Sequence, residues 1–297
     1  MKISGFTFIK NGITLGYPIK ESIETIAPLC DEVIINVGFD DPHLEQDDGT
    51  YQLLTSHFTD KKFIFLKSFW NPQLKAGGLI LSEQTNIALK KCRGDFCIYI
   101  QGDEAIHEDD HKAIRQGIAE MERDESIDGL LFNYLHFYGN VNIIKETRNT
   151  YRREIRVIRN HRNIKSWLDA QGFRHQDNSK LKVIPIQSRI FHYGWARNSF
   201  IMDKKVKSFG KLYHGEAHQE KAHFSYKRIW GLKKFTGTHP QLLGNWINNH
   251  RNDVELLQMK RDYSIKDLNL MVSDFIEQLT GYRMFEYKNF KIKRKYF

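Results

Sequence analysis

Two neighbouring carboxylates, Asp103 and Glu104, follow a short apolar segment and could bind a cation. The segment Phe96–Ile100 is aromatic and β-branched, which favours a buried strand over a helix. In open α/β sheets ligands bind at the carboxyl ends of such strands, and carboxylate oxygens suit Mg²⁺ or Mn²⁺. We therefore predict a divalent-metal site at these two acids, with Gly102 leaving room for a ligand. The alternative is that both acids only begin the next helix, where the helix dipole favours them.

Composition narrows the class of protein. The chain has 297 residues, 40% hydrophobic and 27% charged, which is typical of a globular protein with one large α/β domain or a domain plus an extension. Its net charge of +9 suits a polyanionic partner such as a nucleoside diphosphate, a nucleic acid or an anionic membrane. Three cysteines without a C-x-x-C spacing argue against a zinc site or a disulfide scaffold. With no apolar run of about 18 residues, we expect a cytoplasmic protein.

The first hundred residues alternate between strand and helix patterns, which predicts a Rossmann-like half with a parallel sheet. No G-x-G-x-x-G and no P-loop motif follows the first strand, so dinucleotide oxidoreductases and P-loop NTPases are disfavoured. The expected strands are Ile3–Ile9, Val33–Val37, Lys62–Lys67 and Phe96–Ile100, and the expected helices begin at Pro18 and run over Ser82–Lys91, with Ser82 as the N-cap.

The second hundred residues continue the sheet, and the composition then changes. After a helix that begins at His107 we expect strands at Gly129–Tyr138, Arg152–Arg159, Lys182–Ile186 and Gln187–Tyr193, with a polar loop over Ile164–Phe173. Beyond about residue 200 the chain becomes rich in Lys, His and aromatic residues and helical in pattern. We predict a catalytic domain over residues 1–200 and a helical, basic extension over 201–297.

Residues 82–104 resemble the middle of the family 2 glycosyltransferases with the GT-A fold. In that family a helix ending in Asn-x-Ala and a Gly-Asp pair lead into an apolar strand and a D-x-D motif, and here Asn86-Ile87-Ala88, Gly94-Asp95 and Gln101-Gly102-Asp103 occupy those places. The resemblance implies a Rossmann-like GT-A fold of the α/β class, with a mixed, mainly parallel central sheet. It also implies that Asp103 holds Mn²⁺ or Mg²⁺ on the donor diphosphate. Gln101 departs from the motif, where an acid usually contacts the ribose.

Three further segments agree with this resemblance, which covers roughly residues 1–200. Lys10 and Asn11 follow the first strand, where the family's nucleotide contacts begin. Asp40 or Asp41 matches the acid that reads the nucleotide base, and the sequence leaves both open. The segment IFHYGW resembles the one that supplies a histidine to the metal or diphosphate, which points to His192.

Glycosyl transfer also needs a general base and cations for the leaving group. The family is inverting, so the resemblance implies an inverting reaction with an acidic base. We predict Asp169 for that role, with Trp167 stacking on a sugar, and name Asp177 and Glu154 as alternatives. Candidates for cations, by position only, are Lys75, Arg197 and Lys204.

The leading prediction is a metal-dependent glycosyltransferase that moves a sugar from a nucleoside-diphosphate sugar to a glycan or lipid-linked acceptor in surface polysaccharide synthesis. One alternative is a nucleic-acid-binding protein or metal-dependent nuclease, although no nucleic-acid-binding motif is present and we expect no nucleic-acid partner. A second alternative is a sugar nucleotidyltransferase, for which Lys10-Asn11-Gly12 is a poor match to the usual Gly-rich loop.

Two remaining features have ordinary explanations. His214 and His218 have the spacing of metal ligands on a helix, but they lack the H-E-x-x-H form, and a solvated helix is favoured. The basic end, Lys288–Phe297, is typical of a solvated tail, and it could also attract the protein to an anionic membrane.

Overall fold

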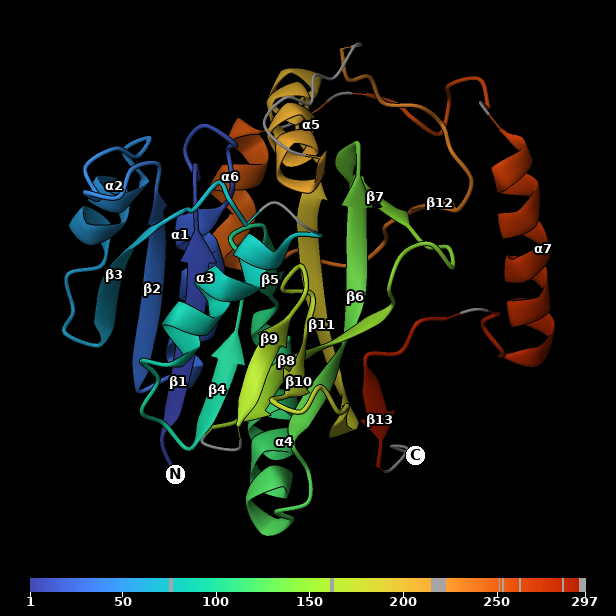
Figure 1. Ribbon diagram of the computed structural model, residues 1–297. Coiled ribbons are helices and arrows are strands. Elements are labelled where there is room, and N and C mark those ends of the chain that lie inside the picture. The colour runs from blue at the N-terminus through green and yellow to red at the C-terminus, as the bar shows by residue number, and fades with distance from the viewer. Residues whose placement is uncertain are drawn as a thin grey trace.

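The computed structural model describes residues 1–74, 77–160, 163–214, 223–250, 252, 254–261, 263–284 and 286–293. Its centre is a large mixed sheet with helices packed on both faces (Figure 1). The main path through the sheet runs in the order β12-β7-β6-β8-β4-β1-β2-β3. The predicted α/β class and mixed central sheet are therefore confirmed.

The parallel half of the sheet is built from the first hundred residues. Strands β2, β1 and β4 lie side by side, with Gly5 of β1 opposite Val33 on one side and Ile98 on the other. All their carboxyl ends meet at one edge, as the apolar runs predicted. The strands are β1 (Ile3–Ile9), β2 (Glu32–Phe39), β3 (Phe63–Phe69) and β4 (Phe96–Tyr99).

Two cores flank this sheet. On one face, α1 (Ile19–Ile26) and α4 (His111–Arg123) bury isoleucines at helical spacing, such as Ile23 and Ile118. On the other face, α3 (Leu79–Leu89) packs against alternate residues of the same strands. Gly78, with φ +76°, precedes α3, and Ser82 instead donates its hydroxyl to the Leu79 carbonyl at 2.9 Å, so Ser82 is not the predicted N-cap.

The other half of the sheet is mostly antiparallel and surrounds the long strand β11. Strand β11 pairs with β6 in parallel and with β5 in antiparallel orientation, so it joins the two sides of the molecule. The strands are β5 (Glu104–Ile106), β6 (Gly129–Tyr138), β7 (Asn140–Lys145), β8 (Arg153–Arg159), β11 (Leu181–Trp195), β12 (Leu232–Lys234) and β13 (Phe290–Ile292).

Three local predictions differ from the structure. The segment Ile164–Phe173 is not a loop, because β9 (Ile164–Trp167) and β10 (Gly172–His175) form a hairpin and only its tip is irregular. Glu104 begins strand β5, so the alternative that both acids only begin the next helix is wrong. A helix that the sequence did not predict, α2 (Thr50–His57), follows the loop after β2.

The remaining helices are η1 (Ala27–Leu29), η2 (Glu108–Asp110), α5 (Ser199–His214), η3 (Gln241–Leu243), α6 (Gly244–Asn249) and α7 (Ile265–Thr280). Packing continues across the composition change near residue 200. Leu243 and Trp246 share a core with Phe137 and Tyr193, and the Trp246 indole donates to the Gly16 carbonyl at 3.1 Å. Within the described part of the chain, no helix combines the length and apolarity needed to cross a membrane.

Candidate active site

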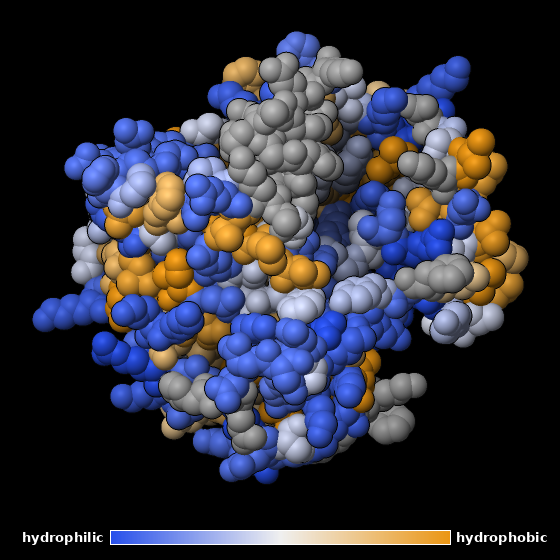
Figure 2. Space-filling model, in the orientation of Figure 1, coloured by the Kyte–Doolittle hydropathy of each residue, from blue (hydrophilic) through white to orange (hydrophobic). Residues whose placement is uncertain are grey.

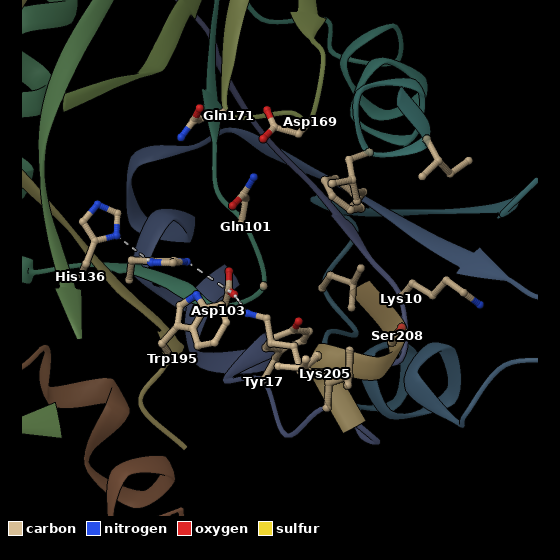
Figure 3. Close-up of a pocket in the computed structure, with 18 of the residues that line it drawn as sticks. Lys10, Tyr17, Gln101, Asp103, His136, Asp169, Gln171, Trp195, Lys205 and Ser208 are labelled. Atoms are coloured by element: carbon tan, nitrogen blue, oxygen red, sulfur yellow. Dashed lines mark hydrogen bonds and ion pairs between the residues drawn. The ribbon is translucent and has the colours of Figure 1, made fainter. Parts of the chain in front are cut away.

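A cavity of about 910 Å³ lies at the carboxyl ends of the parallel strands (Figure 3). Helix α5, the tip of the β9–β10 hairpin and the loop before β8 complete its walls. Six of the predicted site residues line it: Lys10, Asp40, Gln101, Asp103, Asp169 and His192. The other three, Asn11, Asp41 and Glu104, do not.

Asp103 lies in the tight turn between β4 and β5, with its carboxylate among basic groups. Its Oδ2 is 3.2 Å from the Lys205 Nζ and 3.7 Å from the His192 Nε2. Burial alone would raise the pKa of this carboxyl, but Lys205, and after it His192 and Arg197, hold the pKa well below its usual range. Asp103 is therefore ionised, as a ligand for a cation must be.

His192 is oriented by a second histidine. His136 Nε2 lies 2.6 Å from the Tyr151 carbonyl, which can only accept, so this nitrogen carries the proton. Burial, together with the nearby His192, lowers the pKa of His136 to about 3, so the ring is neutral and its Nδ1 accepts from His192 Nδ1 at 3.1 Å. This bond leaves His192 Nε2 facing Asp103, the arrangement that second-shell partners give to metal-binding histidines.

The donor set fits a hard divalent cation that takes its other ligands from a substrate. Gly194 leaves the space, because a Cβ there would lie 2.6 Å from His192 Nε2 and 2.8 Å from Asp103 Oδ2. Among the described residues, no group of three His, Cys, Asp or Glu side chains could hold a metal alone. Mg²⁺ and Mn²⁺ sites of nucleotide enzymes commonly use one or two protein ligands plus phosphate oxygens. Asp103 and His192 are the residues that would hold such an ion.

Glu104, predicted as a metal ligand, is turned away from this position. It is fully buried, and its two oxygens accept from Arg156 at 3.0 and 2.8 Å. The Tyr134 hydroxyl donates to the same carboxylate at 2.7 Å. The structure therefore gives Glu104 a structural ion pair and does not bring it to the metal position.

The first two strands form the opposite wall of the cavity. Lys10 forms an ion pair with Asp40, and its ammonium lies 5.9 Å from the centre of the Trp70 ring. Asp41 instead accepts from backbone N–H groups of its own loop at 2.7 to 3.0 Å, so of the two acids only Asp40 lines the cavity. Asn11, with φ +54°, makes the turn after β1.

Asp169 is presented by an unusual hairpin tip. Leu168 and Ala170, on either side of it, both have left-handed φ angles, +49° and +60°. The Ala170 carbonyl accepts from the Gln101 side-chain amide at 3.2 Å, which fastens the tip beside Asp103. A carboxylate in place of Gln101 could not donate this bond, which gives a reason for the departure from D-x-D. Burial raises the pKa of Asp169, while backbone hydrogen bonds oppose the shift.

The other residues considered near the hairpin do not face the cavity. Glu154 is buried beside Gly172, where an added Cβ would lie 2.9 Å from its Oε2. Asp177 accepts from the Ser179 N–H on an exposed turn. The Trp167 ring lies against Lys165 and Arg174, outside the cavity. Aromatic walls are provided instead by Tyr17, Trp70 and Trp195.

The cation nearest Asp103 is one the sequence did not single out. Lys205, on α5, donates to Asp103 and to the Gly194 carbonyl at 2.9 Å, and burial lowers its pKa to about 8 against the opposing effect of Asp103. Its neighbour Lys204 lies over the Phe200 ring, outside the cavity. Arg197 is fully buried behind the site and covers the Tyr17 ring at 4.4 Å. In the structure Met202 and Lys205, three residues apart on α5, are both buried, and the sequence alone does not reveal this.

Lys75 lies outside the described residues, and so do His218 and the side chain of His214. Residues 294–297 of the basic end are also outside them.

No protein-family model and no curated protein sequence matches this chain. Among solved structures, it is similar to Staphylococcus aureus TarS 1–349 in complex with UDP, with 18% identity over 54% of this chain and 47% of that one and a TM-score of 0.36. It is also similar to glucosyl-3-phosphoglycerate synthase from Mycobacterium tuberculosis in complex with Mn²⁺, UDP and glucosyl-3-phosphoglycerate, with 18% identity, 48% and 46% coverage and a TM-score of 0.29. The matched part is thus less than half of either solved chain.

Proposed function

We propose that this protein is a metal-dependent, inverting glycosyltransferase of the GT-A type. The observation that carries the proposal is that two acidic groups share one cavity. An ionised Asp103 lies beside His192 and Lys205. A second acid, Asp169, lies on the hairpin tip that Gln101 holds through the Ala170 carbonyl. The first set suits a departing diphosphate, and the second suits a hydroxyl that must lose a proton.

The donor is a nucleoside-diphosphate sugar. Its nucleotide lies along the wall of Lys10, Asp40 and Trp70, where a ring can stack and hydroxyls can bond. Its diphosphate lies between Asp103, His192 and Lys205. A divalent ion held by Asp103 and His192 would act there as a Lewis acid.

The acceptor is a glycan or a lipid-linked glycan. Asp169 takes the proton from an acceptor hydroxyl, whose oxygen bonds to the anomeric carbon of the donor sugar. The bond from that carbon to the diphosphate oxygen breaks, and Lys205 stabilises the charge that the leaving group gains. Attack on the face opposite the leaving group gives inversion.

Ligand-dependent thermal unfolding tests the donor site. UDP, GDP, CDP and dTDP should each be measured with Mn²⁺ and with EDTA, on the wild type, Asp103→Asn and Asp40→Asn. A ligand at a hundred times its Kd stabilises the folded state by about 2.7 kcal/mol. We expect one diphosphate to raise Tm only with metal, and this rise to disappear in Asp103→Asn. Asp41→Asn, in an acid bonded only to its own loop, is the matched control and should respond like the wild type.

Two other outcomes would overturn the proposal. If no diphosphate stabilises the protein but DNA or RNA does, the nucleic-acid prediction replaces it. A two-metal nuclease lacks support among the described residues, since no cluster of three metal-ligating side chains is found there. Release of pyrophosphate from a nucleoside triphosphate and a sugar phosphate would favour the nucleotidyltransferase instead. Membrane contact through the basic end stays a prediction.

A further inference from the structure

The outer face of α7 carries a row of large, exposed apolar side chains. Figure 2 shows hydrophobic side chains gathered along the edge where Figure 1 places α7. The face is formed by five large side chains of α7, with their exposed fractions in parentheses: Ile265 (82%), Leu268 (57%), Val272 (60%), Phe275 (61%) and Leu279 (70%). We call this set the α7 seam. Its members are separated by alternating steps of three and four residues, the a/d spacing of a helix that pairs with another helix.

The inner face of α7 is already partnered. Asp274 accepts from the Trp230 indole at 2.7 Å, and Glu277 accepts from Arg152 at 3.1 Å and from Arg283 at 2.7 Å. These two acids therefore point toward the body of the protein and keep charge away from the seam. The inner face is mixed, since it buries Leu270 and Ser273 beside these acids, while the large apolar side chains of the seam stay exposed. A helix that only covers a core would place such apolar side chains inward.

The residues beside the seam are neutral. Heptad position e is occupied by Asn269 and Ile276. Position g is occupied by Met271 and Gln278. Like charges at these positions would oppose the pairing of identical helices, and none is present. A helix that lies on an anionic membrane carries Lys and Arg beside its apolar face, and these positions have neither.

We propose that the α7 seam is the centre of an interface with a second copy of this chain. Because the same neutral, apolar face would meet itself, the contact is isologous and closes as a two-fold dimer. Ile265 and Val272 at position a and Leu268 at position d follow the preference of two parallel helices. This inference does not depend on the proposed enzymatic function.

The seam is connected to the cavity through the inner face of α7. Glu277 bonds Arg283, and Arg283 in turn donates to the Thr150 carbonyl at 3.1 Å. Thr150 and its neighbours Asn149 and Tyr151 line the cavity. Pairing through the seam would therefore also hold this wall in place.

Sedimentation velocity on the full chain, over a wide range of concentrations, tests the interface. We expect the wild type to form dimers and the double variant Val272→Glu/Phe275→Glu to stay monomeric, because two charges would be buried in the seam. Phe200→Glu is the matched control, since Phe200 is 69% exposed on another helix, and it should dimerise like the wild type. Far-UV circular dichroism should show the same helix content in all three proteins, and their thermal midpoints should agree at concentrations low enough for all three to be monomeric.

A cross-linking variant gives a second, independent measurement. In a parallel dimer Val272 faces its own copy, so Val272→Cys should form an intermolecular disulfide under mild oxidation, while Gln278→Cys should form far less. A wild type that is monomeric at every concentration would overturn the proposal, and so would a double variant that still dimerises. If the monomeric wild type binds vesicles of anionic lipid and the double variant does not, the seam is a membrane face instead.

Discussion

Asp169 owes its position to its two neighbours. The left-handed φ angles of Leu168 and Ala170 bend the chain sharply on both sides of it, and Gln101 fixes the bend from across the cavity. Non-glycine residues in this conformation are sparse and cost about 1–3 kcal/mol each, so they are usually found where function requires them. The backbone therefore supports the choice of Asp169 over the other two acids.

We expect Asp169→Asn to bind donor normally and to lose at least about a hundred-fold in transfer rate, the usual effect of removing a general base. Burial raises the pKa of Asp169, and a base acts only when deprotonated. Wild-type transfer should therefore fall, as pH is lowered, at a pH above the ordinary aspartate value of about 3.9. Initial rates of transfer across pH, alongside donor titrations, provide the measurement. Asp177→Asn, on an exposed turn, should keep full activity, and unchanged transfer in Asp169→Asn would end the assignment.

Glu154 makes the stability of the protein depend on pH. Burial, with Asp169 nearby, raises its pKa to about 8 despite Arg156, so the folded protein holds a proton that the unfolded chain releases at an ordinary glutamate pKa of about 4.3. The stability from this proton is complete below that value and is lost as pH rises through about 8, with a slope of up to about 1.4 kcal/mol per pH unit. Urea unfolding from pH 5 to 9 should show this slope, and Glu154→Gln should flatten it. Equal slopes in the two proteins would contradict the shift.

Residue type and order were enough to nominate Asp103 and His192, but not to separate Asp103 from Glu104. Asp103 is still in the turn and Glu104 is the first residue of β5, and in this arrangement Asp103 faces the cavity while Glu104 is buried in the core. Which acid is buried depends on where Arg156 lies, 52 positions later. Lys205 escaped notice for a similar reason, because only the orientation of α5 distinguishes it from Lys204.

A buried ion pair joins Glu104 of β5 to Arg156 of β8, two strands that do not pair with each other directly. Arg156 and Glu104 are both fully buried and joined by two hydrogen bonds, and the Arg156 guanidinium also covers the Tyr99 ring at 5.1 Å. Buried pairs contribute little net stability, but breaking one leaves an uncompensated charge.

Glu104→Gln should therefore destabilise the protein by about 3–5 kcal/mol in urea unfolding. Glu146→Gln, which removes half of an exposed ion pair with Lys233, is the comparison and should cost at most about 1 kcal/mol. The double variant Glu104→Gln/Arg156→Met should recover part of the loss. Equal effects at the buried and the exposed pair would show that the core tolerates a lone Arg156.

Sequence patterns predicted the strands well where both faces of the sheet are covered by helices. The strands β1, β2 and β4 are mostly apolar and almost entirely buried, and such segments have few alternatives to a buried parallel strand. The β9–β10 hairpin escaped prediction because its first strand, Ile164–Trp167, is short and half polar. Its position is fixed from outside, by Asn86, whose side chain accepts from the Ser166 N–H at 2.8 Å.

On the scale of the whole molecule, the segment after residue 200 completes the cavity. Lys205 reaches Asp103, and Tyr226 donates to the Trp195 carbonyl at 3.0 Å and the Arg197 carbonyl at 2.6 Å. The composition change near residue 200 was visible in the sequence. That the two parts share a core was not, because contacts between distant segments leave no local pattern.

A chain that ends at Asn198 should therefore neither bind a nucleoside diphosphate nor unfold cooperatively. It lacks Lys205, and it exposes the apolar surface that Tyr226 and Trp246 cover. Thermal unfolding of the shortened chain, alone and with UDP, GDP, CDP or dTDP in the presence of Mn²⁺, would test both expectations. A truncated protein that unfolds in one transition and binds as the full chain does would establish an independent domain.

The hairpin tip has a consequence for how this protein can change. Several features lower the stability of the fold in one small region. Leu168 and Ala170 have strained backbone angles, and the nearby Glu154 is buried with one carboxyl oxygen that has no hydrogen-bond partner. Natural proteins stay only slightly above the stability that selection requires, and strained sites are where stability is most easily regained. Substitutions that stabilise this protein should therefore be found most often around the hairpin. Variants that carry them would unfold at higher temperature and catalyse transfer more slowly.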